Sequence, residues 1–133
     1  MDLKTLETRI IEFGGQKRQY HVVDRNLGFP APKFFISYGQ GIPFISDEVP
    51  EPYRNPMVFH ELMEFGVLKG QSNACLNALL TELESVPVAI KYAYIRFRTE
   101  VFEHLICYLE DHESSSPFIP EARKSLGHLR GLL

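Results

Sequence analysis

The segment His60-Glu61-Leu62-Met63-Glu64 combines residue types that can bind a metal ion and activate water. On an α-helix, residues four apart lie on the same face, so the His60 imidazole and the Glu64 carboxylate can reach one point. Both groups are zinc ligands in proteins. Glu61, beside His60, can then act as general base toward a metal-bound water. The helical signature H-E-x-x-H uses this arrangement, with a second histidine where this chain has Glu64.

A catalytic zinc site also needs a third protein ligand, because such sites combine three protein ligands with a water molecule. The next predicted helix offers Cys75, Glu82 and Glu84. Cys75 and Glu82 are seven residues apart and share about one helix face, whereas Glu84 points elsewhere. We therefore predict that the third zinc ligand is Glu82 or Cys75, and the sequence leaves this choice open.

Residues 42–84 resemble the zincin-like metallopeptidases. The shared features are a small sheet, a proline-rich approach, a helix with H-E-x-x-E and a second helix with acidic groups. The resemblance implies that His60 and Glu64 bind zinc and that Glu61 is the catalytic base. It further implies a metal-dependent hydrolase of the peptidase type. The full family motif has histidine at the position of Glu64.

Two interpretations without a metal remain open for the same segment. In the first, His60 packs at the edge of the core while Glu61 and Glu64 are solvated. In the second, the carboxylates form buried ion pairs with Arg96 or Arg98 of a later helix. The helix around His60 is otherwise strongly apolar. Its charged groups therefore need partners or water.

The N-terminal part of the chain fits two local structures. Apolar residues at three- and four-residue steps favour a helix over residues 2–13 that ends at Gly14-Gly15. The alternative is a hairpin of residues 9–13 and 16–23, because Gly-Gly also suits a tight turn. We expect the helix.

Short β-prone segments follow this region. Residues 20–23, 34–38 and 42–46 predict three strands, and the glycines at 39 and 41 predict that the last two form a hairpin. Pro43 lacks an N–H group, so we expect it at a sheet edge or at the start of its strand. Residues 47–56 contain three prolines and predict a connector without regular structure.

The second half of the chain predicts a block of helices. Residues 90–98 also alternate apolar and polar side chains, so a strand there is the alternative to a helix. The expected helices run from Met57 to Gly66 or Gly70, from Ser72 or Asn73 to about Glu84, from Pro87 to about Asp111, and onward from Pro120.

The predicted element order is an N-terminal helix, a small antiparallel sheet and a C-terminal block of helices, which is an α+β fold. The chain has 133 residues, and 44% of them are apolar. A core of this size fits one domain, so we expect a single domain over residues 1–133.

The net charge and the lack of targeting patterns in the sequence limit the expected partners and cellular location. The net charge of −3 gives no long-range attraction to phosphate, so nucleic acid is not an expected partner. The sequence has neither a signal-peptide pattern nor a bilayer-length apolar run, which predicts a cytoplasmic protein without membrane contact. Both cysteines are expected to be reduced, with Cys107 buried and inert.

A second function class is compatible with the same sequence. The small size, the mild acidity and the incomplete catalytic set are compatible with a non-catalytic domain that neutralises a toxin or regulates a peptide or protein partner. Such a domain would bind through its sheet edge or through exposed Tyr and Phe side chains.

Overall fold

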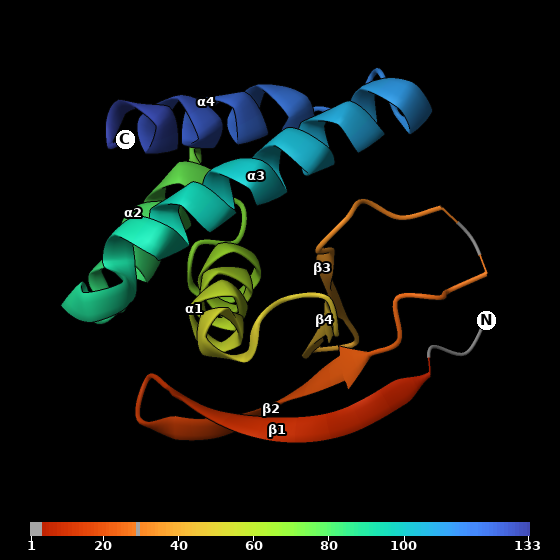
Figure 1. Ribbon diagram of the computed structural model, residues 1–133, viewed down its shortest axis with the longest axis vertical. Coiled ribbons are helices and arrows are strands. Elements are labelled where there is room, and N and C mark those ends of the chain that lie inside the picture. Colours follow the sequence, from red (N-terminus) through yellow and green to blue (C-terminus); the bar gives the residue numbers. More distant parts are fainter. Residues whose placement is uncertain (1–3, 29) are drawn as a thin grey trace.

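Over residues 4–28 and 30–133, which the computed structural model describes, the chain forms a four-stranded sheet followed by helices, an α+β arrangement (Figure 1). Figure 1 shows α1 between the sheet and the group formed by α2, α3 and α4. The elements are β1 (Thr5–Phe13), β2 (Gln16–Val23), β3 (Ile36–Gly39), β4 (Ile42–Ser46), α1 (Glu51–Leu62), the π-helix η1 (Met63–Val67), α2 (Ala74–Glu84), α3 (Val88–His112) and α4 (Phe118–Gly131).

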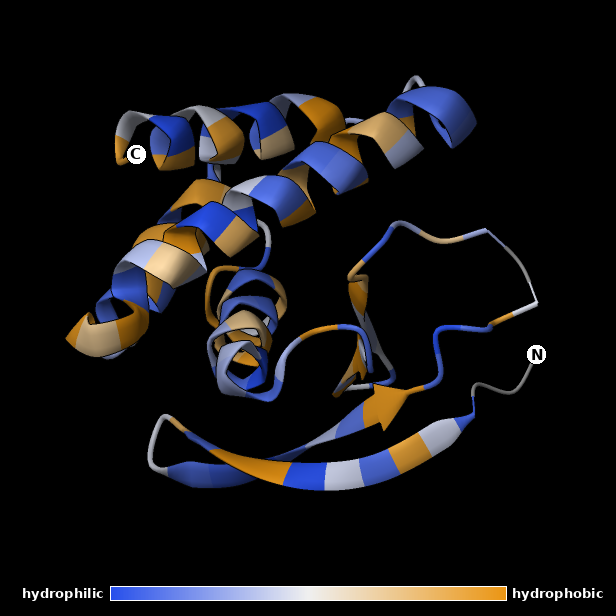
Figure 2. Cartoon of the chain, viewed as in Figure 1, coloured by the Kyte–Doolittle hydropathy of each residue, from blue (hydrophilic) through white to orange (hydrophobic). Residues whose placement is uncertain are grey.

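The expected N-terminal helix is wrong, and the alternative hairpin is correct. β1 and β2 pair as antiparallel strands around Gly14 and Gly15, whose φ angles of 59° and 78° suit a two-residue hairpin turn. Hydrophobic and hydrophilic residues alternate along β1 in Figure 2. Ile10, part of the helical pattern, is 60% exposed, while Ile11 is buried. Asp2 and Leu3, the expected start of the helix, lie outside the described residues.

The sheet is mixed rather than antiparallel. Its strand order is β1-β2-β4-β3, and β2 pairs with β4 in parallel. The predicted hairpin of β3 and β4 is confirmed. Pro43 is the second residue of β4, and the pairing with β2 begins one residue later at Phe44. The missing N–H group of Pro43 is therefore tolerated near the start of the strand, as expected.

The proline-rich connector is shorter than expected, because α1 already begins at Glu51. Pro52 lies in the first turn, where backbone N–H groups have no partner within the helix. Pro56 lies inside α1, and Met57 and Val58 beside it are fully buried. Tertiary packing of this apolar segment outweighs the loss of one backbone hydrogen bond at Pro56.

The structure confirms that the second half of the chain forms the predicted helices, with small differences in their bounds. α2 ends at Glu84 and α3 begins directly after Pro87, so the alternative strand at residues 90–98 is wrong. α4 begins at Phe118, slightly before the expected Pro120. Cys107 is exposed on α3 rather than buried, whereas Cys75 is fully buried on α2.

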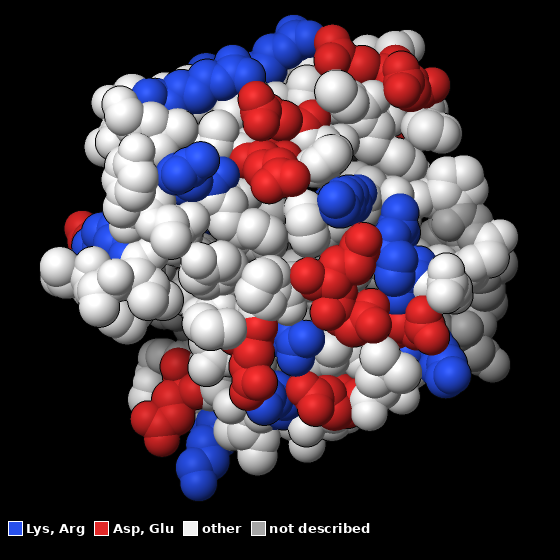
Figure 3. Space-filling view, in the orientation of Figure 1, with Lys and Arg blue, Asp and Glu red and all other residues white. Residues whose placement is uncertain are grey.

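The surface carries mixed charge. Basic and acidic side chains are interspersed over most of the face shown in Figure 3. Among the described residues, no helix combines the length and apolar content that a membrane crossing requires.

Candidate metal centre

His60 and Glu64 lie where α1 passes into the π-helix η1. His60 belongs to the last turn of α1, and Glu64 is the second residue of η1. Their side chains are 2% and 6% exposed, and His60 Nε2 lies 3.0 Å from Glu64 Oε1. The predicted pairing of these residues on one helix face is therefore confirmed. Short π-helical turns often occur at functional sites.

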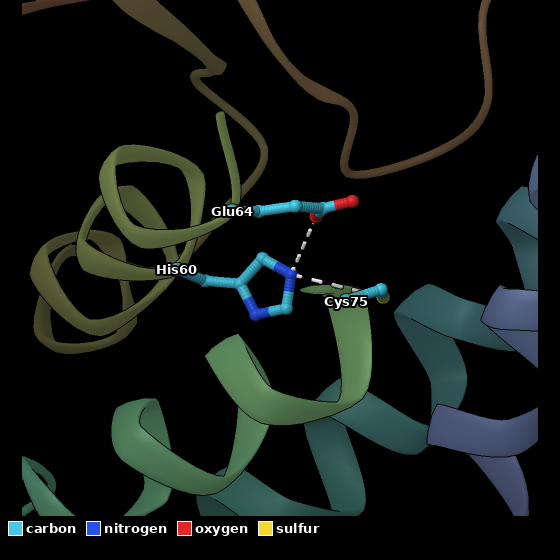
Figure 4. A group of neighbouring side chains, drawn as sticks. All are labelled: His60, Glu64 and Cys75. Carbon is cyan, nitrogen blue, oxygen red and sulfur yellow. Dashed lines mark hydrogen bonds and ion pairs between the residues drawn. The ribbon is translucent and has the colours of Figure 1, made fainter. Parts of the chain in front are cut away.

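Cys75 completes a group of three ligand-type atoms. It lies in the first turn of α2, and its Sγ atom is 3.9 Å from His60 Nε2. The ligand atoms of His60, Glu64 and Cys75 all lie within 4.8 Å of one another, and Figure 4 shows the three side chains converging. In tetrahedral zinc sites, neighbouring N and O ligands are about 3.3 Å apart, and N and S ligands about 3.6 Å. The two separations from His60 Nε2, 3.0 Å to Glu64 and 3.9 Å to Cys75, each lie about 0.3 Å from these values.

Glu82, the other predicted third ligand, lies on the opposite side of the His60 ring. Its Oε1 atom is 2.7 Å from His60 Nδ1, although this contact is poorly aligned for a hydrogen bond. Carboxylates in this position orient the ring of a metal-binding histidine and increase its basicity. The structure therefore separates the two candidates, with Cys75 beside Nε2 and Glu82 beside Nδ1.

Arg98 and Tyr94 hold Glu82 in place from α3. Arg98 Nε lies 2.7 Å from Glu82 Oε2, its NH2 group lies 3.1 Å from Oε1, and the Tyr94 hydroxyl donates to Oε2. All three side chains are at most 3% exposed. Burial acts to raise the pKa of Glu82, but Arg98 and His60 outweigh it and hold this pKa below its usual value. Glu82 is therefore ionised.

Without a metal ion, the same geometry favours a protonated His60. Burial lowers the pKa of the imidazole, but Cys75, Glu64 and Glu82 outweigh it and raise the pKa well above its usual value. The proton on Nε2 lies on the side of Glu64 and Cys75. A metal bound there would replace this proton, because only the unprotonated nitrogen is a ligand.

Glu61 is a buried carboxyl group without a protein partner. It is 7% exposed, and the described residues offer it neither a hydrogen bond nor an ion pair. Burial raises its pKa to about 7, with Glu64 and Glu82 acting in the same direction and His60 and Arg98 against it. A carboxyl group that titrates near neutral pH can accept and return a proton during a reaction.

Glu61 shares a cavity of about 300 Å³ with His60, Glu64 and Cys75. Side chains of β3, of the loop before it, of η1, of α3 and of the start of α4 form the remaining walls. This cavity gives a small molecule room to approach the ligand-type atoms and the free carboxyl group together.

The structure decides between the two metal-free interpretations. Glu61 and Glu64 are buried, so their expected solvation is wrong. Arg98 forms the predicted buried ion pair, but with Glu82, while Arg96 is exposed. Arg98 pairs with Glu82 on the Nδ1 side of the imidazole and also lines the cavity that contains Glu64 and Cys75.

Two contacts of this centre were not predicted. The Tyr94 hydroxyl donates to Glu82 Oε2, and Ser125 Oγ of α4 lies 3.2 Å from Cys75 Sγ. A tyrosine at helical spacing from Arg98 was a usable signal for the first contact, since residues four apart share a face. The second depends on how α4 packs against α2, which local sequence does not encode.

Comparisons with protein-family models, with curated proteins and with solved structures found no match. The centre is therefore interpreted from its own geometry.

Proposed function

We propose that this protein is a zinc-dependent hydrolase in which His60, Glu64 and Cys75 bind the metal and Glu61 is the general base. One observation carries the proposal. Three ligand-type atoms from α1, η1 and α2 converge in a cavity that also contains a buried, unpartnered carboxyl group. Three protein ligands leave the fourth tetrahedral position free for water or substrate, as in catalytic rather than structural zinc sites.

Each residue has a distinct part in this proposal. His60, Glu64 and Cys75 would hold a zinc ion, which would polarise a carbonyl group and acidify water. Glu61 takes a proton from the attacking water and returns one to the leaving group. The charge of Glu82 beside Nδ1 favours a proton on that nitrogen, which leaves Nε2 toward Glu64 and Cys75. Arg98 neutralises the buried Glu82 carboxylate, so the charge of Glu82 has a partner inside the protein.

The reaction is hydrolysis of an amide or ester bond. The oxygen of water forms a bond to the carbonyl carbon, and the bond from that carbon to nitrogen or oxygen breaks. The products are a carboxylic acid and an amine or alcohol. No oxidant or second substrate is needed, and peptide bonds belong to this chemical class.

Measuring the metal content of His60→Ala tests the proposal. The wild-type protein is expected to retain about one zinc ion per chain after dialysis, and His60→Ala to lose it, because the central ligand is gone. His104→Ala is the matched control, since His104 lies 3.6 Å from Glu100 on an exposed part of α3. Folded wild-type protein that stays zinc-free after incubation with zinc would contradict the proposal.

A further inference from the structure

The cavity at the proposed zinc site has a polar inner end and mainly apolar walls. His60, Glu61, Glu64, Cys75 and Arg98 supply the polar end, and Lys33 and Ser37 lie at the exposed mouth. The walls are mainly aromatic rings from the segment around β3, from η1, from α3 and from the start of α4. These rings belong to Phe34, Phe35, Tyr38, Phe65, Phe102 and Phe118. A ligand that fills this cavity must therefore combine a polar reacting group with an apolar body.

The polar end lies deep inside the molecule. The five side chains at that end are at most 7% exposed. The exposed members of the lining are Lys33, Ser37 and Phe65, which mark the mouth of the cavity. A substrate must therefore enter with its reacting group first.

The volume of the cavity sets the size of the group that can enter. Its 300 Å³ is at the lower end of the range for small-molecule sites, about 300–1,000 Å³. A closed apolar cavity of about 150 Å³ holds one benzene molecule. The cavity thus has room for a ring-sized group and the adjoining carbonyl group. An internal peptide bond needs chain on both sides of the reacting carbonyl, and the buried end of this cavity leaves no path for the second side.

We propose that the site hydrolyses small amides or esters with an aromatic or branched apolar acyl group, and that it excludes internal peptide bonds. This inference rests on the proposed function and narrows its substrate class. The acyl group occupies the aromatic walls, and the carbonyl group lies at the polar end near Glu61. Hydrolysis adds water across the acyl bond and releases the apolar acid and a small amine or alcohol.

Hydroxamic acids of different size provide the test, because both hydroxamate oxygens can bind a metal ion. The cobalt-substituted protein is titrated with benzohydroxamic and acetohydroxamic acid, and the cobalt absorption reports binding. Benzohydroxamic acid is expected to bind at least about tenfold more tightly, since its ring buries apolar area that the methyl group lacks. Equal affinities would overturn the inference.

Leu105→Trp locates the binding pocket for the ring. Leu105 is a half-buried residue of α3 that lines the cavity. A larger side chain there takes the space of the ligand ring, so the affinity for benzohydroxamic acid is expected to fall about tenfold while cobalt binding persists. Ser37→Trp, at the exposed mouth, tests the same point without changing the core. Leu80→Trp is the control, because Leu80 is exposed on α2 and is not part of the lining.

The outcomes separate the two proposals. Failure to bind cobalt or zinc would overturn the proposed function itself. Metal binding without preference for the aromatic ligand, or with no effect of either cavity variant, would overturn only the substrate class. The expected result for the zinc-loaded protein is hydrolysis of benzoyl amides or esters without cleavage of unfolded casein. Cleavage of casein at internal peptide bonds would also overturn the proposed substrate class.

Discussion

Replacing Glu61 by glutamine is expected to lower the rate of ester or amide hydrolysis by about 10²–10⁴-fold while zinc stays bound. The amide has nearly the same shape as the carboxyl group but cannot accept the proton of the attacking water. Glu61 is not one of the three converging ligand-type residues, so the metal content should not change. The turnover number kcat on a benzoyl ester and the zinc content of the same sample measure the two effects.

Glu84→Gln is the matched control for this substitution. Glu84 is an exposed glutamate at the end of α2 and does not line the cavity. Its replacement should leave both kcat and zinc content unchanged. A Glu61→Gln protein with full activity would remove Glu61 from the catalytic role, even if zinc binding were confirmed.

Arg98→Ala is expected to lower the free energy of unfolding by about 3–5 kcal/mol, because it removes one partner of a buried ion pair and leaves the Glu82 carboxylate with only the protonated His60 as a cation beside it. Arg98 is 3% exposed and makes two nitrogen–oxygen contacts with Glu82. The alanine also removes the contact of the guanidinium with the Phe102 ring, whose centroid lies 4.7 Å from it. Urea denaturation of the metal-free protein measures the loss.

Arg96→Ala provides the comparison for Arg98→Ala on the same helix. Arg96 is exposed, so its removal should change the free energy of unfolding by no more than about 0.5 kcal/mol. Joint replacement by apolar residues, Glu82→Leu with Arg98→Met, should cost less than Arg98→Ala, because no buried charge remains unpaired. Equal losses for Arg96→Ala and Arg98→Ala would show that the ion pair does not stabilise the fold.

The central part of the site was predictable because it is local. His60 and Glu64 are four residues apart on a segment with strong helical signals, and helix geometry alone brings them together. The choice between Cys75 and Glu82 was not predictable in the same way. Both face α1, and which one meets Nε2 depends on how α2 packs along the His60 ring. The spacing in the sequence limits the candidates for the third ligand to these two residues, but it does not determine how α2 packs against α1.

The N-terminal region shows a different limit of sequence reasoning. Leu6, Ile10 and Phe13 follow a helical period, yet Leu6 and Ile10 remain exposed on β1. The segment forms a strand because β2 offers it a partner, and the Gly14-Gly15 turn sets the antiparallel register. Such strand pairing is a tertiary effect, and it outweighs the weak helical periodicity of the apolar residues in this segment. The parallel pairing of β2 with β4 likewise joins segments distant in sequence.

The function of this centre depends on what lies between His60 Nε2, Glu64 and Cys75. A proton in that position makes the cluster a buried network of ion pairs and hydrogen bonds that only stabilises the fold. A zinc ion in the same position makes it a reactive centre with Glu61 beside it. Both states use the same side chains, so loss of stability in variants does not distinguish them.

X-ray absorption at the zinc edge of the zinc-loaded protein tests this point most directly. If His60, Glu64 and Cys75 bind the zinc ion, the spectrum should show one sulfur neighbour at about 2.3 Å together with nitrogen and oxygen neighbours at about 2.0–2.2 Å. Cys75→Ser should remove the sulfur neighbour, while Cys107→Ser, on the exposed side of α3, should leave it in place. A zinc environment without sulfur in the wild-type protein, or one unchanged in Cys75→Ser, would show that Cys75 is not a zinc ligand.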